Sequence, residues 1–315
     1  MTSVLPYTSL SEYLRRRHGA KVVRIPLTLH QVCPQHAAGR PGCLFCLPAA
    51  YAPPAAQQQG TAVEQLQRGI ARARARDRAT KFVAYLQSGS NTHGEPAALR
   101  RVYEALLAQP DVVALSIATR PDCLDDAILA VLAELSRQHD LWVELGVQTL
   151  QERSLTWLQR GHDAACARDA VRRLREIGIA HIVAHLILGL PGETIDDMHA
   201  SVRGCVHAGV HGLKLHHLQV MRATPLEAEW RAGRVPTLTL DAYAAVVAEL
   251  LARVPRDIVI HRLCASTPAQ YLCAPLWPGT KPEHLAAITR ALAMDGVCTY
   301  AAGGCAETPT TSRRG

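Results

Sequence analysis

The feature that most constrains the fold is a regular alternation of strand-like and helix-like segments between residues 81 and 220. The strand-like runs are KFVAYLQ (81–87), VVALSIAT (112–119), LWVELGVQ (141–148), AHIVAHLILG (180–189) and GLKLHHLQV (212–220). Helix-like runs lie between them, at 95–109, 124–138, 163–178 and 194–209. With the β-rich run 22–29 and a helix that begins near Thr61, they make six βα units. The alternation predicts an α/β fold with a parallel sheet and outer helices, either a barrel or a doubly wound sheet.

The segments on either side of this pattern divide the chain into three predicted parts. Residues 1–21 are an N-terminal basic segment, 22–260 are the βα core, and 261–315 are a small C-terminal extension with a flexible tail. After residue 220 the pattern is looser. A helix at about 239–253, a strand at 257–263 and a last helix at 282–294 are still expected.

Charge and cysteine usage limit the cellular setting. The formal net charge is +7 and the sequence pI about 9.0, which favours an anionic partner such as nucleic acid, although the same charge also suits solubility alone. The N-terminus has no apolar signal-peptide region, and no run of 18 uncharged apolar residues predicts a membrane span. We therefore expect a cytoplasmic protein, in which the ten cysteines are thiols or metal ligands rather than disulfides.

A loop at residues 30–47 follows the first expected strand and carries Cys33, Cys43 and Cys46. Ligands in parallel α/β folds bind beyond the carboxyl ends of the strands, so this loop belongs to the ligand-binding face. Two metal sites fit three thiols here. One is a zinc site with His36 as the fourth ligand. The other is a four-iron cluster with only three cysteine ligands, whose open iron binds nitrogen and oxygen of a small molecule. The βα context favours the cluster.

Several polar residues inside the expected strands predict a cavity. His185, Lys214 and His216 share an inward-facing parity and are expected to line the substrate pocket, although a strand histidine is more often a satisfied core residue. Glu144 also lies within a strand, and a buried carboxylate needs a partner. We expect Arg120 to be that partner.

The other cysteines are candidates for a second metal site. Cys264 with Cys273, and Cys298 with Cys305, are possible ligands of an auxiliary cluster, but their irregular spacing favours inert thiols.

Five motifs in order carry a resemblance to a known family: SIATRPDCL (116–124), VELGVQT (143–149), RGHD (160–163), AHLILGLPGET (184–194) and GLKLHHLQVMRATPL (212–226). Together with the cysteine loop, they resemble the radical S-adenosylmethionine (SAM) superfamily. They are most similar to its YhcC-type proteins, which are sisters of the catalytic subunit of Elongator. The resemblance covers roughly residues 20 to 290. Two segments differ from relatives, Pro34-Gln35-His36-Ala37 after the first cysteine and Cys264-Ala265-Ser266 after the late HRL.

The resemblance implies a partial (βα)6 TIM-like barrel with a small C-terminal extension. It implies that Cys33, Cys43 and Cys46 bind a [4Fe–4S] cluster whose open iron is chelated by SAM. One-electron reduction, by a flavodoxin- or ferredoxin-type donor, then cleaves SAM to methionine and a 5′-deoxyadenosyl radical that abstracts hydrogen from substrate. The SAM-binding residues implied by position in the barrel are Gln87, Ser88, Arg120, Glu144, Gln148, Leu188, Gly189 and Leu190.

The basic charge and the likeness to Elongator suggest RNA as the substrate, with the wobble uridine of tRNA as the leading hypothesis. A separate modification enzyme is then expected to carry out another step on the same base. Two alternatives are a radical SAM enzyme that acts on a small molecule or peptide, and a non-catalytic iron–sulfur or zinc binding scaffold.

Overall fold

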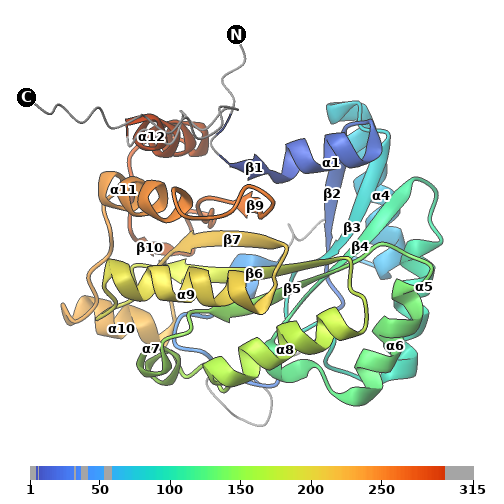
Figure 1. The fold of residues 1–315 in the computed structure, drawn as a ribbon, viewed down its shortest axis with the longest axis horizontal. Coiled ribbons are helices and arrows are strands. Elements are labelled where there is room, and N and C mark those ends of the chain that lie inside the picture. The colour runs from blue at the N-terminus through green and yellow to red at the C-terminus, as the bar shows by residue number, and fades with distance from the viewer. Residues whose placement is uncertain (1–4, 6, 32, 37–41, 53–58, 295–315) are drawn as a thin grey trace, which may run out of the picture.

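The main sheet is a parallel half-barrel, as the computed structural model shows for residues 5, 7–31, 33–36, 42–52 and 59–294 (Figure 1). Its order is β1-β9-β7-β6-β5-β4-β3-β2, and all of its strand pairs are parallel. The strands are β1 (Thr8–Ser9), β2 (Val22–Leu27), β3 (Lys81–Leu86), β4 (Val112–Thr119), β5 (Leu141–Gln148), β6 (His181–Leu188), β7 (Gly212–His217) and β9 (Val259–Arg262). The expected partial TIM-like barrel is confirmed.

Outer helices cover the convex face of this sheet and hold its core. Thr61, Asp125, Asp163 and Thr194 each cap a helix, accepting a hydrogen bond from a backbone N–H of the first turn. Leu, Ile and Val side chains fill the space between helices and strands, which fits a chain with few aromatic residues. The helices are α4 (Ala62–Asp77), α5 (Pro96–Leu107), α6 (Asp126–Ser136), α8 (Ala164–Glu176) and α9 (Ile195–Ala208).

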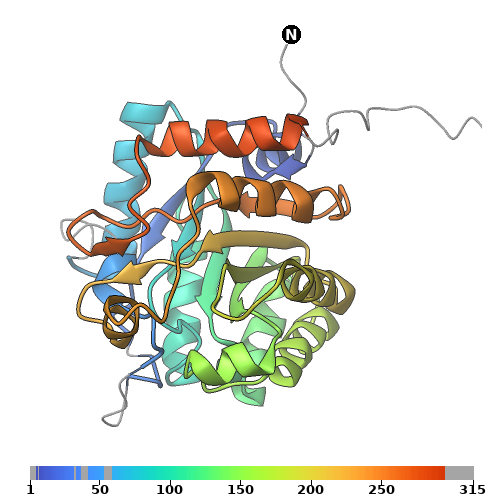
Figure 2. The same ribbon diagram turned by 90° about the vertical axis from the view of Figure 1, so that its left-hand side faces the viewer.

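Both segments that flank the predicted core contribute to its sheet. Within the N-terminal segment lie β1 and the helix α1 (Leu10–His18), and β1 pairs with β9. The predicted boundary at residue 260 falls inside β9. The expected helices near the C-terminus are α11 (Leu240–Leu251) and α12 (Lys281–Met294), which pack side by side (Figures 1 and 2). Cys298, Cys305 and the tail lie outside the described residues.

The remaining elements are short and lie mostly in the loops between the main ones. They are α2 (Pro48–Tyr51), the 3-10 turn η1 (Pro121–Cys123), α7 (Glu152–Trp157), α10 (Pro225–Arg231), and the antiparallel pair β8 (Val220–Met221) and β10 (Leu272–Ala274). In the described part of the chain, every helix is too short or too polar to cross a membrane.

The two ends of the half-barrel differ in chemistry. At the end where the strands begin, Leu14 of α1 packs with Val83, Ala114 and Trp142 in a small apolar cluster. At the other end, where the strands finish, the cysteine loop and the polar residues that follow the strands come together. The fold therefore leaves one end for packing and the other for a ligand site.

Candidate functional site

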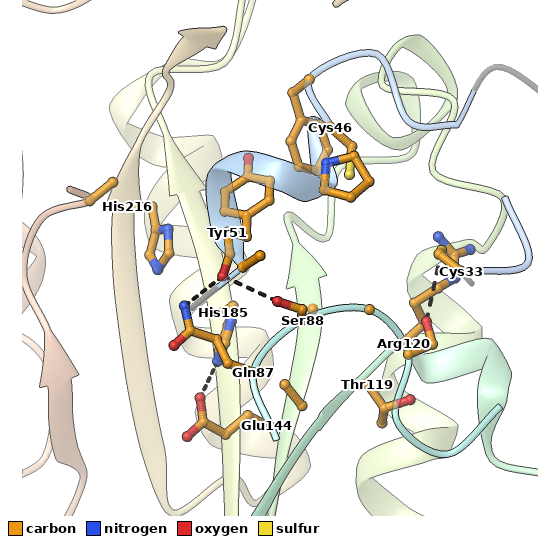
Figure 3. Close-up of a pocket in the computed structure, with 18 of the residues that line it drawn as sticks. Cys33, Cys46, Tyr51, Gln87, Ser88, Thr119, Arg120, Glu144, His185 and His216 are labelled. Carbon is orange, nitrogen blue, oxygen red and sulfur yellow. Dashed lines mark hydrogen bonds and ion pairs between the residues drawn. The ribbon is translucent and has the colours of Figure 1, made fainter. Parts of the chain in front are cut away.

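A cavity of about 510 Å³ lies at the carboxyl ends of the strands (Figure 3). Its wall combines the cysteine loop with residues of or just after strands β3 to β7 and β9. Most of the site residues expected from the sequence line it: Cys33, Cys46, Gln87, Ser88, Arg120, Glu144, His185, Lys214 and His216. Cys46 lies near the top of the view in Figure 3, and Glu144 with His185 near the bottom.

The cysteine end of the cavity is supplied with hydrogen-bond donors. Cys43 is only 3% exposed, and its Sγ accepts from Nη1 of Arg120 at 3.7 Å and from Nη1 of Arg160 at 3.3 Å. Ser90 Oγ donates to Cys33 Sγ at 3.8 Å. Arg120 and Arg160 therefore place two positive charges beside this sulfur.

Burial sets the protonation of the third thiol, Cys46. Desolvation, with a further contribution from the neighbouring Cys43, raises the pKa of Cys46 to about 12. Deprotonation of Cys46 therefore needs a cation beside its sulfur. All cysteines of the described residues are free thiols.

His36 lies close to these cysteines and lines the same cavity. Its backbone N–H donates to Cys33 O at 2.8 Å, and its buried Nε2 has no partner among the described residues. The ring sits against Gly42, where a Cβ would lie 2.1 Å from His36 Cε1, so only glycine fits there. In the described ranges, no three His, Cys, Asp or Glu side chains are grouped so as to hold a single metal ion.

Gln87 and Ser88 follow β3 and hold the short helix α2 in place. Gln87 Nε2 and Ser88 Oγ both donate to the carbonyl oxygen of Tyr51, at 3.0 Å and 3.2 Å (Figure 3). The end of the cysteine loop is thereby tied to the rim of the barrel.

The floor of the cavity is an ion-pair network around Glu144, which is fully buried. Oε1 accepts from Arg24 and from Ser116 Oγ, and Oε2 accepts from His185 Nε2 at 2.7 Å and Lys214 Nζ at 3.0 Å. Burial by itself raises the pKa of Glu144, but the charges of Arg24 and Lys214 outweigh it and hold the pKa well below its usual range. Glu144 is therefore a carboxylate.

The expected partnership of Glu144 with Arg120 is wrong. Arg120 pairs with Asp122 through two hydrogen bonds of 2.9 Å and 2.8 Å, and donates to Arg160 O at 2.6 Å. The residue level with Glu144 on β4 is Ala118. Arg120 lies two residues further along, about 7 Å nearer the cysteines at the usual strand rise.

Burial lowers the pKa of two basic groups that face Glu144, namely Lys214 and His185. Desolvation lowers the pKa of Lys214 to about 7, against the opposing pull of Glu144. It also lowers the pKa of His185 to about 4, with the positive charge of Lys214 adding to the effect. His185 is therefore neutral at pH 7. Its ring stacks on His216 at a centroid distance of 5.8 Å, and the buried His216 Nε2 has no partner in the described part of the chain.

Four of the expected SAM-binding residues lie away from this cavity wall. Leu188 and Leu190 are buried, and Gly189 turns between them with a φ of 80°. Gln148 has a φ of 71° at an irregularity in the pairing of β5 with β6. On the same two strands, Gly146 of β5 and Ile187 of β6 line the cavity.

Sequence reasoning missed three residues that line the cavity, Tyr85, Arg160 and Arg262. It also missed Arg24, whose guanidinium lies over the Tyr85 ring at 3.7 Å and pairs with Glu144. One signal was available. Arg24 and Arg262 are charged residues within mostly apolar strand runs. Burying a charge there costs free energy unless it is paired, so such residues indicate a polar site.

Comparison with known proteins agrees with this geometry. The radical SAM superfamily model matches residues 30–204, and the Radical_SAM C-terminal domain model matches 210–294. Protein YhcC of Escherichia coli strain K12 is 35% identical over 293 residues, 92% of this chain and 93% of that protein.

Two further likenesses are more distant. The tRNA uridine(34) acetyltransferase of Dehalococcoides mccartyi is 32% identical over 175 residues, 54% of this chain and 37% of that protein. The structure of Elp3 from the archaeon Methanocaldococcus infernus matches with a TM-score of 0.67 at 17% identity, over 88% of this chain and 63% of that one. This last match concerns the fold alone.

The family model spans more than half of the chain, and YhcC is similar over nearly its whole length. The chain belongs to the radical SAM superfamily, among its YhcC-type members.

Proposed function

We propose that this radical SAM enzyme modifies the wobble uridine of tRNA. The observation that carries the enzymatic part is the cavity with three cysteines of one loop at one end and a buried ion-pair network at the other. Membership of the superfamily makes the chain an enzyme that uses a [4Fe–4S] cluster and SAM, which sets aside the hypothesis of a non-catalytic scaffold. The choice of tRNA is supported by the partial similarity to a tRNA uridine(34) acetyltransferase and by the net charge of +7.

Cys33, Cys43 and Cys46 are the proposed cluster ligands, and their surroundings fit that role. All three belong to one loop, and Arg120 and Arg160 place positive charge at Cys43 Sγ. Phe45 is 9% exposed and lines the cavity next to Cys46, so it keeps water away from that end. When bound, the cluster and SAM supply one-electron cleavage of SAM and a radical that removes hydrogen from the substrate.

The chain's own residues bind and orient SAM and the substrate. Gln87 and Ser88 lie at the methionyl side of the proposed SAM position, where they also fix α2 through Tyr51 O. The network of Glu144, Lys214 and His185 forms the opposite wall, and we assign it to the substrate side together with His216. A one-electron donor of flavodoxin or ferredoxin type is the proposed redox partner.

Anaerobic reconstitution tests the ligand assignment. The wild-type chain is expected to take up about four irons with a broad brown absorbance, and dithionite with SAM is expected to release 5′-deoxyadenosine. Cys43→Ala should lose the cluster, whereas Cys166→Ala, a thiol on the outer helix α8, should keep it. An intact cluster in Cys43→Ala contradicts the assignment.

Mass spectrometry of tRNA nucleosides tests the substrate. A strain that lacks the gene is expected to show an altered modified uridine at the wobble position. An unchanged nucleoside profile contradicts the tRNA proposal and favours the alternative, a small molecule or peptide, which a cavity of about 510 Å³ also accommodates.

A further inference from the structure

A second cavity of about 540 Å³ lies beside the first, at the seam where the sheet fails to close. In the sheet order, β2 is the strand at one end, and β1 next to β9 is at the other. Helix α1 packs against β2 and against β9, so it bridges the gap between these edges (Figure 1). The seam cavity is lined from both sides of the gap, by residues of β2, β9, α1 and α12.

The charged side chains that line the seam cavity are all cationic: Arg24, Lys214, Arg262 and Lys281. Glu144 neutralises part of this charge, because it pairs with Arg24 and Lys214 from the side of the first cavity. Neither Arg262 nor Lys281 has a side-chain hydrogen bond or ion pair with any described residue, and Arg262 is only partly exposed. Arg262 and Lys281 therefore give the seam positive charge that no carboxylate among the described residues pairs with.

Two hydroxyl groups line the same cavity as these cations. Ser9 caps α1 and Ser11 lies in its first turn, with their oxygens 3.1 Å apart, and both residues line the seam cavity. Guanidinium, ammonium and hydroxyl donors together are the groups that proteins use to bind phosphate oxygens.

The two cavities share a wall. Tyr85, Gln87, Lys214 and Arg262 line both of them. A ligand that spans this wall places one part beside the cysteine loop and its neighbour in the cationic seam. A nucleotide has this form, with an uncharged base joined through a sugar to an anionic phosphate.

We propose that the seam cavity binds the phosphate of the nucleotide whose base enters the first cavity. This inference rests on the proposed action on RNA, and it names Arg262 and Lys281 as the residues that recognise the phosphate.

Binding to the reconstituted full-length enzyme tests the proposal. Isothermal titration calorimetry with uridine 5′-monophosphate (UMP) and with uridine is expected to show about tenfold tighter binding of UMP, or about 1.4 kcal/mol, because the phosphate adds charge-assisted contacts that uridine lacks. Inorganic phosphate should compete with UMP. Arg262→Gln should reduce the preference for UMP over uridine several-fold and flatten the salt dependence of UMP binding.

A second variant of the proposed phosphate site and a matched control complete the test. Lys281→Gln, at the exposed start of α12, should weaken UMP binding without disturbing the strands. Arg203→Gln, an exposed arginine of α9 outside both cavities, should change nothing. Thermal unfolding checks that each variant is folded.

Several results would overturn the proposed phosphate site. Absence of UMP binding, equal affinity for UMP and uridine, or wild-type UMP affinity in both Arg262→Gln and Lys281→Gln overturns the proposal. Competition by acetate but not by phosphate overturns it in favour of a carboxylate ligand. Phosphate-dependent UMP binding with an unchanged tRNA nucleoside profile keeps the phosphate site and rejects only the tRNA function.

Discussion

Glu144 is the single residue on which the polar interior most depends. It is fully buried in the middle of β5, and it contacts Arg24, Lys214 and His185, each from a different strand. Buried ion pairs add little net stability when intact, but removing one partner leaves the other charges without compensation. The carboxylate therefore makes it possible for cations to line the inside of the barrel.

Replacing this carboxylate tests that argument. Glu144→Gln should lower the free energy of unfolding by about 3–5 kcal/mol, because it removes the carboxylate that pairs with Arg24 and Lys214. Chemical denaturation measures the loss. The matched control is Glu176→Gln on the surface of α8, where the carboxylate is 57% exposed and pairs with Arg172. The control should change stability by less than about 0.5 kcal/mol.

The difference in stability between wild type and Glu144→Gln should also depend on pH. The folded state holds the pKa of Glu144 well below its usual range, so the stabilisation is complete above the ordinary carboxyl pKa and is lost as pH falls through the lowered value. The stability difference between wild type and Glu144→Gln should therefore shrink as pH drops below about 4. A difference that stays constant into acid contradicts the assigned role.

At the scale of elements, helix starts position the loops that follow the strands. Helix α9 begins at Thr194, whose Oγ accepts from Asp197 N at 3.2 Å while Asp197 Oδ2 accepts from Thr194 N at 2.8 Å. Just before it, Glu193 Oε1 accepts from Thr149 Oγ1 at 2.7 Å. The capping box fixes the start of α9, and the hydrogen bond between Thr149 and Glu193 joins the loop after β6 to the end of β5.

Thr194→Ala should therefore cost about 1 kcal/mol in the free energy of unfolding, because one helical N–H loses its side-chain acceptor. Thermal or chemical unfolding measures it. Thr80→Ala is the control, since the exposed Thr80 side chain makes no hydrogen bond to the described residues. An equal effect in both variants contradicts a specific role for the cap.

At the scale of the whole molecule, the N-terminal segment closes one end of the half-barrel. Leu14 of α1 is 3% exposed among residues near the starts of three strands, and Tyr13 stacks on His181 at a centroid distance of 5.2 Å. The predicted basic segment does carry exposed arginines, but its other face packs.

Leu14→Ala should lower the free energy of unfolding by about 2–5 kcal/mol, since it empties a packed site between α1 and the sheet. Denaturant unfolding checks this. Leu276→Ala, at a side chain that is 73% exposed, should change stability by less than about 0.5 kcal/mol. A Leu14→Ala protein as stable as the control shows that α1 does not close the barrel.

The sequence by itself determined the elements and their order. The predicted ranges 112–119 and 141–148 coincide with β4 and β5, and the six βα units are all present, because strand and helix periods are local properties of the chain. The radical SAM assignment followed from motifs in the same way. The helix α1 was missed because its arginines dominate a short segment whose packing face has few apolar residues.

Only the tertiary structure decided which charges meet. Glu144 and Arg24 are 120 positions apart, and Glu144 and Lys214 are 70 apart, so nothing local in the chain indicates their pairing. The nearest candidate by motif, Arg120, pairs with Asp122 because strand register places it beyond the reach of Glu144. The seam cavity likewise forms between β2, at one end of the sheet, and β9, next to the other end, which are far apart in the chain. Register and closure depend on packing over the whole sheet, and local sequence does not encode them.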